Sequence, residues 1–287
     1  MRAQGRFHVF RELNFNRGLF FWVGTRELLP SGWRWFSAVV QHDAEQNENS
    51  LTYLAQSALQ RVARALQARD AIHVALNQPQ NNDTRDQALS SLDVVLMLLM
   101  GAVDAAARVA HHVLNLDYPE HRAGWQREDW LSRVRKGARP HAAVVSEGAE
   151  ATLVLTILRR LRNQIHGAAL QGIGVMGSQE EQSLIALPPA AAEEVLEAAE
   201  ALGGHEKWGL RSILPDRFHI DPGILVDQLF PAVLELLNSL MQQTPVERLP
   251  GVDSPPQEVP PIQGGAGGTL NPFDPIIRAS IRWQLGF

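Results

Sequence analysis

The sequence predicts a mainly α fold: a helical bundle with one or two short β-hairpins and a disordered, Pro/Gly-rich C-terminal tail. Three observations lead to this class. Several segments of helical length carry apolar residues at spacings of three and four. Two pairs of short apolar runs are separated by glycine or proline, which is typical of hairpins. After Thr244 the composition changes sharply to proline and glycine, which cannot build a core.

Apolar periodicity places the helices in order along the chain. Residues 32–41 form a short predicted helix and residues 50–74 a longer one, for which Ser50 is a suitable N-cap. A polar loop at 78–83 precedes a long predicted helix over 84–116. This helix is apolar on nearly every side, as expected of a central helix. Further helices are predicted over residues 142–170, 190–202 and 222–241, with hairpins over 172–187 and 208–220.

Composition divides the chain into four parts. An aromatic-rich N-terminal extension, with a short expected strand at residues 20–23, is predicted to pack on the core of a helical domain. A Pro/Gly-rich linker follows. The last apolar segment regains helical spacing, so it is expected to dock on a partner or back on the domain. The predicted bounds are 1–49 for the extension, 50–243 for the domain, 244–271 for the linker and 272–287 for the last segment.

Composition and charge exclude several classes of protein. The 287 residues include no cysteine, which excludes disulfides, thiolate metal sites and a cysteine nucleophile. The net charge of −5 argues against broad, non-specific coating of nucleic acid. The N-terminal sequence has no apolar run of signal-peptide length, and the most hydrophobic stretch, residues 94–103, is too short to span a bilayer. We therefore expect a soluble, cytoplasmic protein that makes no contact with a membrane.

Positive charge is concentrated in one section of this acidic chain. Residues 122–167 contain nine basic side chains against four acidic ones. Within that section Arg159, Arg162, Asn163 and His166 fall within about 100° of one another on a helix, at about 100° per residue. We call these four residues the motif stripe. Arginine keeps its charge and histidine titrates near neutral pH, so the stripe can bind a phosphate and move a proton.

A structural explanation of the motif stripe stands beside the functional one. Basic residues near the C-terminal end of a helix favourably oppose the negative end of its dipole, and Gly167 suits a helix end. The position of the stripe in the only basic section of an acidic chain favours the functional explanation.

A second polar group lies on the long central helix. Asp104, Arg108 and His111 project from one side of it, either as a hydrogen-bonded polar group in the core or as a second shell around the motif stripe. Asp104 and His111 lack a third ligand of suitable spacing, so no metal is predicted. A G-x-G-x-x-G run at residues 172–177 follows a helix, whereas a dinucleotide-binding loop follows a strand, so no cofactor is predicted.

The run Arg-Asn-x-x-His that starts at Arg162 resembles the motif of the HEPN (higher eukaryotes and prokaryotes nucleotide-binding) superfamily. In that motif a histidine follows an arginine after four to six intervening residues. Here Arg162 leaves three residues before His166, whereas Arg160 leaves five and Arg159 leaves six, so which arginine fills the family role stays open. The likeness covers roughly residues 50–243.

The resemblance implies a compact helical bundle that forms a homodimer with its motif helices facing each other. Many members are metal-independent endoribonucleases of toxin–antitoxin, abortive-infection or antiviral systems, and others are inactive interaction modules. This chain is accordingly expected to cleave RNA as a toxin or antiviral defence effector. An antitoxin or defence-system partner is expected at the C-terminal segment. The alternative is a catalytically inactive helical dimerisation or interaction module.

The chemistry of the motif stripe agrees with RNA cleavage. RNA carries its own nucleophile, the 2′-hydroxyl. Neutral His166 would accept its proton, because adjacent guanidiniums disfavour the charged imidazole. Arg159 and Arg162 would stabilise the charge that develops on phosphorus, and Asn163 would orient His166 or the phosphate. One imidazole cannot easily act as base and as leaving-group acid at once, so a dimer that presents two copies is the expected arrangement.

Overall fold

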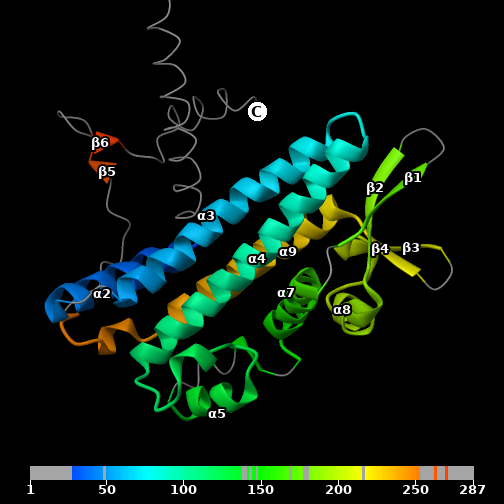
Figure 1. Cartoon of the computed structure of the whole chain (residues 1–287). Coiled ribbons are helices and arrows are strands. Elements are labelled where there is room, and N and C mark those ends of the chain that lie inside the picture. Colours follow the sequence, from blue (N-terminus) through cyan, green and yellow to red (C-terminus); the bar gives the residue numbers. More distant parts are fainter. Residues whose placement is uncertain are drawn as a thin grey trace, which may run out of the picture.

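The molecule is built around a hairpin of two long helices, α3 (Ser50–Leu76) and α4 (Asn82–Val113), which lie side by side (Figure 1). A capping box begins α4. The Asn81 side chain accepts from the Thr84 backbone amide at 3.0 Å, and the Thr84 hydroxyl accepts from the Asn81 amide at 3.0 Å. Both helices and the polar loop between them match the predicted elements to within a few residues.

The computed structural model describes most of the chain between residues 28 and 252. The expected strand at 20–23 and the C-terminal segment at 272–287 lie outside the described residues. The described residues are 28–47, 50–137, 141, 144–146, 148–167, 170–176, 181–214 and 217–252, with two short backbone pieces, β5 (Ile262–Gln263) and β6 (Thr269–Leu270). Within these ranges side chains are described except at residues 137, 166–167, 173, 175–176, 181–182, 214, 262–263 and 269–270.

Two further helices, α2 (Pro30–Gln46) and α9 (Pro222–Gln243), pack on the hairpin and complete the core. Asp221 caps α9, because its Oδ1 accepts from two backbone amides of the first turn, both at 3.1 Å. From α2, Trp35 is buried in the same hydrophobic cluster as the apolar faces of α4 and α9. The fold is therefore mainly α, as the apolar periodicity predicts.

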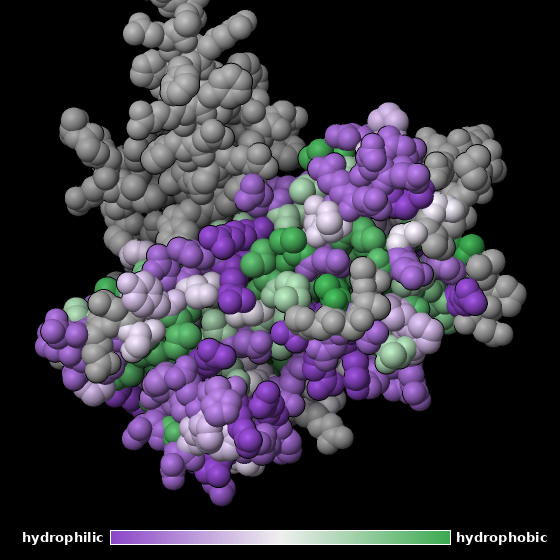
Figure 2. Space-filling view, viewed as in Figure 1, coloured by the Kyte–Doolittle hydropathy of each residue, from purple (hydrophilic) through white to green (hydrophobic). Residues whose placement is uncertain are grey.

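The helix α4 and the segment Pro222–Arg248 are long and apolar enough to cross a membrane, judged by length and composition alone. Inside the fold 50% and 56% of their apolar windows are buried. Figure 2 shows that hydrophobic residues also reach the surface over the middle of α4, where Val94 is 46% exposed. Packing within the bundle therefore accounts for part of this apolar length.

The helix that carries the motif stripe, α7 (Glu150–Gly167), contacts α4, α8 and α9. Its predicted start at residue 142 is wrong. Gly148 adopts the left-handed backbone conformation, with φ of 75°, which interrupts a helix. The Ser146 carbonyl accepts from the Thr152 hydroxyl at 2.7 Å, so the preceding turn is closed onto the first turn of α7. The motif stripe therefore occupies the C-terminal half of the helix.

The connection from α4 to α7 includes, among its described residues, the 3₁₀ turn η1 (Glu120–Arg122) and the helix α5 (Glu128–Gly137). Their tryptophans anchor them to the core. Trp125 is 3% exposed and Trp130 is 0% exposed, and their rings meet edge-on with centroids 4.9 Å apart. The tryptophans therefore fix where this part of the basic section lies.

The two predicted hairpins are confirmed and join into one antiparallel sheet at the end of the bundle (Figure 1). The strand order is β1-β2-β4-β3. The contact between hairpins pairs Ile185 with Ile220, and Ile220 is buried. The helix α8 (Pro189–Ala201) connects the hairpins and packs against α7. The strands are β1 (Gly172–Met176), β2 (Glu181–Ala186), β3 (Leu210–Leu214) and β4 (Arg217–Ile220).

The chain stays packed beyond the end of α9. The 3₁₀ turn η3 (Val246–Arg248) follows, and Val246 and Leu249 are buried against the core. An ion pair of 2.9 Å between Arg34 and Glu247 connects this turn to α2. The predicted start of the linker at residue 244 is therefore too early, since the chain through Val252 belongs to the fold.

We expect Gly209→Ala to lower the free energy of unfolding by about 2–4 kcal/mol. Gly209, between η2 (Glu206–Trp208) and β3, has φ of 71°, and an added Cβ would lie 2.9 Å from the Asp221 carbonyl oxygen. The matched control is Gly148→Ala, where φ is 75° but no atom of the described residues lies within 4 Å of an added Cβ. That variant should lose only about 1 kcal/mol. Equal losses in urea titrations of the two variants would show that the contact with Asp221 contributes nothing.

Candidate functional site

The C-terminal half of α7 presents three members of the motif stripe to one pocket of about 360 Å³. Arg159, Arg162 and Asn163 line it, while Leu158 and Leu161 on the adjacent helix face are fully buried. Spacings of three and four on one helix produce this division. We call it the basic pocket; its lining residues are Met100, Asp104, Arg108, His121, Ala123, Gly124, Trp125, Gln126, Arg127, Arg159, Arg162 and Asn163.

Two other parts of the chain complete the basic pocket. The helix α4 contributes Asp104 and Arg108, one turn apart, so these two residues agree with the second predicted alternative, a second shell around the motif stripe. The connection from η1 to α5 contributes residues 121–127, including His121 and Arg127. Four of the lining residues are arginines and one is a carboxylate, so the pocket attracts an anion that accepts several hydrogen bonds.

Burial and charge oppose each other at Asp104. Burial raises the pKa of its carboxyl, whereas the guanidiniums of Arg162 and Arg108 favour the charged form and act in the opposite direction. The net result is a raised pKa.

Glu194 of α8 holds two neighbouring arginines of α7. Arg160 donates to both carboxylate oxygens through its Nε and Nη2 atoms, and Arg159 Nη2 lies 3.7 Å from Glu194 Oε2. Arg160 is absent from the lining of the basic pocket, in agreement with its position about 100° away from Arg159 around a helix. Burial, followed by the charge of Arg160, lowers the pKa of Arg159, so the pocket side of this pair lies in a partly desolvated environment.

The three remaining members of the motif stripe follow Arg159 towards the C-terminal end of α7. Arg162 Nη1 donates to Asn163 Oδ1 at 3.1 Å, which orients the amide beside the guanidinium. His166 follows Arg162 by one turn of the same helix, and its side chain lies outside the described part of the structure. Three of the four predicted site residues are therefore placed together, and the fourth is placed by its backbone.

Three N–H donors beside the basic pocket find no acceptor among the residues that the structure describes. They are Arg159 Nε, Arg162 Nε and Trp125 Nε1, which are buried, and all three residues line the pocket. A buried donor without a partner costs free energy, so such groups mark places that water or a ligand completes. An acceptor-rich anion suits this set of donors.

Two histidines differ in their relation to the basic pocket. His111 takes the first predicted alternative, a hydrogen-bonded polar group in the core, whereas His121 lines the pocket without having been predicted. His111 is buried and its Nδ1 accepts from Trp130 Nε1 at 3.4 Å, so it does not line the basic pocket. Burial lowers its pKa, which keeps it neutral. His121 of η1 lines the pocket instead. The only sequence signal for His121 is its place next to the basic section, because a loop has no periodicity that would show where its side chains point.

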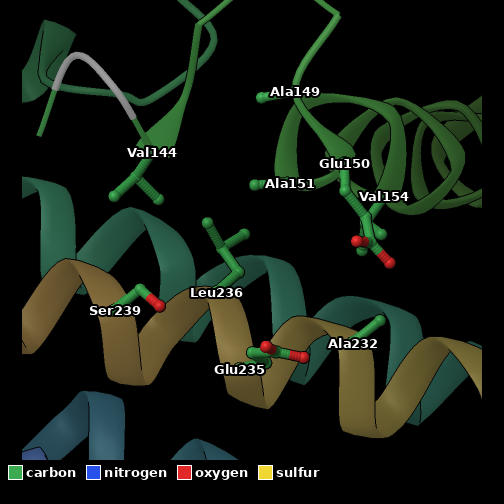
Figure 3. Close-up of a pocket in the computed structure, with 9 residues that line it drawn as sticks. All are labelled: Val144, Ala149, Glu150, Ala151, Val154, Ala232, Glu235, Leu236 and Ser239. Carbon is green, nitrogen blue, oxygen red and sulfur yellow. The ribbon is translucent and has the colours of Figure 1, made fainter.

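A second pocket, of about 230 Å³, lies near the start of α7 and contrasts with the basic one (Figure 3). Glu150 of α7 and Glu235 of α9 line it among mostly apolar side chains. Two carboxylates repel a phosphate, so this pocket does not suit the ligand that the basic pocket attracts.

Comparisons with protein-family models, with curated proteins and with solved structures find no match, so no family is assigned and the likeness to the HEPN superfamily stays a prediction.

Proposed function

We propose that this protein is a metal-independent endoribonuclease of HEPN type that binds the phosphate backbone of RNA in the basic pocket. The observation that supports the proposal is the convergence of Arg108, Arg127, Arg159 and Arg162 on one pocket together with Asn163. Guanidiniums bind phosphate oxygens in a forked geometry, and several of them can stabilise a phosphorus centre that gains negative charge.

Each residue of the motif stripe has its own role in the proposed reaction. Arg159 and Arg162 stabilise the pentacoordinate phosphorus, and Asn163, already bonded to Arg162, orients the phosphate. His166 accepts the proton of the 2′-hydroxyl. The lone carboxylate, Asp104, is suited to accept a hydrogen bond from a ribose hydroxyl or a base amino group, which a bare inorganic anion lacks.

We extend the proposal to the location of the protein, its oligomeric state and its partners. The protein would act in the cytoplasm as a homodimer, as a toxin or antiviral defence effector, with an antitoxin or defence partner at the C-terminal segment. The apolar surface over the middle of α4, where Val94 is 46% exposed, supports a contact with another protein chain.

A second candidate function is a catalytically inactive interaction module that binds a partner or a nucleotide phosphate through the same surface. The observation in its favour is Glu194, which pairs with both Arg160 and Arg159 and so satisfies part of the positive charge inside the chain. A stripe whose charges are internally paired is suited to holding α7 against α8.

Incubation of single-stranded RNA with the protein and excess chelator separates the two candidates. We expect cleavage to persist with chelator, since no step needs a metal, and His166→Ala to slow it by about 100-fold or more. The products should carry a 2′,3′-cyclic phosphate and a 5′-hydroxyl. Wild-type protein that binds RNA but leaves it intact at high concentration would support the interaction module, and cleavage abolished by chelator would contradict the metal-independent mechanism.

A further inference from the structure

The basic pocket contains a second imidazole for which the motif stripe does not account. His121 of η1 lines the pocket together with Arg159, Arg162 and Asn163 of the same chain. It is exposed, so its presence in the pocket is not required to fill the core. Its backbone is held nevertheless, because Ala123 and Trp125 beside it are 8% and 3% exposed.

We infer that His121 is the general acid of the proposed ribonuclease reaction, so that one chain carries both proton-transfer groups. This role rests on the proposed function and extends it. Cleavage of RNA needs a base for the 2′-hydroxyl and an acid for the departing 5′-oxygen, and one imidazole cannot do both in the same step. A second chain is needed to supply the acid only if the first chain lacks one near the phosphate.

Bonds and protons balance when His166 acts as the base and His121 as the acid. The 2′-hydroxyl gives its proton to neutral His166 while its oxygen forms a bond to phosphorus. The bond from phosphorus to the 5′-oxygen breaks, and protonated His121 gives that oxygen its proton. The products are a 2′,3′-cyclic phosphate and a 5′-hydroxyl, with His166 protonated and His121 neutral. His166 then loses its proton to water and His121 takes one up, so both histidines return to their starting states.

The position of His121 fits this division of labour. The pocket lies between the end of α7, which carries His166 one turn beyond Arg162, and η1, which approaches from the end of α4. Base and acid in such a displacement act on opposite sides of the phosphorus, because the attacking and leaving oxygens are in line. His121 belongs to η1 and the backbone of His166 to the end of α7, so the two residues come from different elements. The proposal places their imidazoles on opposite sides of the phosphorus.

A substrate with an activated leaving group tests the acid directly. One RNA contains an ordinary linkage and a second has sulfur in place of the bridging 5′-oxygen, which leaves without a proton. We expect His121→Ala to slow cleavage of the ordinary linkage by about 100-fold or more and to cleave the sulfur linkage within about tenfold of wild type. His166→Ala should slow both. The control is His73→Ala, which should slow the cleavage of neither RNA. His73 is an exposed histidine of α3 that pairs with Asp227.

The outcomes separate this role from the proposed function. Wild-type protein that leaves both RNAs intact overturns the nuclease proposal, and the role of His121 with it. Wild type that is active, with His121→Ala unimpaired or equally impaired on both RNAs, overturns the general-acid role and leaves the nuclease standing.

Mixed subunits test whether one chain holds the whole site. We expect co-expressed His121→Ala and His166→Ala chains to remain as inactive as each variant alone, because no chain then has both imidazoles. Recovery to roughly a quarter of wild-type activity in the mixed preparation would mean that the two histidines come from different chains, and would overturn the single-chain site.

Discussion

Arg162→Ala is expected to slow RNA cleavage by about 100- to 1000-fold, the range seen when one preorganised donor to a developing anion is removed. Arg162 is the residue of the basic pocket that contacts Asn163 and lies one turn before His166. Its charge also favours the ionised form of Asp104. The melting temperature should stay unchanged, because its one described hydrogen bond is solvent-exposed. Single-turnover cleavage and thermal unfolding measure the two quantities.

Arg160→Ala is the matched control for that experiment. Arg160 is two positions away on α7, carries the same charge and donates to Glu194 without lining the basic pocket. Its removal should leave the cleavage rate within about threefold of wild type. Arg162→Lys keeps the positive charge but loses the forked N–H donors of the guanidinium, so its cleavage rate should lie between those of Arg162→Ala and wild type.

The three variants also decide which arginine fills the role that the motif leaves open. A large loss in Arg160→Ala with little loss in Arg162→Ala would contradict the assignment of the basic pocket as the site. If Arg162→Ala instead unfolds at a much lower temperature, the motif stripe is structural, and the dipole of α7 explains it.

The helices of this fold could be predicted because their signals are local. Asn81 and Thr84 are three residues apart and begin α4, and Asp221 begins α9 by bonding amides of its own first turn. The wrong start of α7 has a physical cause of the same local kind. Gly148 in the left-handed region interrupts an otherwise continuous helical pattern, and an isolated glycine in a sequence does not reveal its φ.

The sheet shows the limit of local information. Each hairpin could be predicted from its own strands. The pairing of Ile185 with Ile220 that joins them depends on the packing of α8, which lies between β2 and β3 in the sequence. Such contacts between distant segments have no sequence periodicity.

At the candidate site, too, the positions of residues on one helix could be predicted, whereas contacts between distant segments could not. Helical geometry correctly separates Arg159 and Arg162 from Arg160, because all three are on one helix. The contribution of Glu194 from α8 and of His121 from η1 comes through tertiary packing, so neither could be predicted. His111 has the helical phase of Asp104, and it takes the other predicted alternative, a hydrogen-bonded polar group in the core, where Trp130 donates to it.

Acid is expected to destabilise the fold through His141, a histidine that is 0% exposed. Its Nε2 lies 3.1 Å from the Thr244 hydroxyl and 3.3 Å from the Leu240 carbonyl oxygen, to which it donates, and its buried Nδ1 has no partner among the described residues. Within that part of the chain a second proton would therefore sit on a buried nitrogen with no acceptor. Burial lowers the pKa of His141 from 6.5 to about 4, against the weaker opposite effect of the Leu240 carbonyl.

The sign of the effect follows from proton binding. Between pH 6.5 and about 4 the unfolded chain binds a proton at this histidine and the folded chain does not, so stability falls as the pH falls. The loss relative to neutral pH should be about 2 kcal/mol near pH 5 and about 3 kcal/mol near pH 4. Urea titrations across this range measure it. His111, whose pKa is also lowered, acts in the same direction, whereas Asp93 and Asp104, whose pKa values are raised, act in the opposite one.

A variant that removes only the imidazole isolates His141 from these other groups. His141→Phe keeps a flat ring against Trp125, whose centroid is 5.3 Å from that of the histidine, and Thr244 retains its own bond of 2.7 Å to the Leu240 carbonyl. The variant should lose about 1 kcal/mol at neutral pH and then change less with acid than wild type. The carboxyls and His111 titrate in both proteins, so they cancel in the difference between the two curves. Parallel curves from pH 7 to pH 4 would mean that His141 already binds its second proton in the folded protein, and that the end of α9 opens to let water reach it.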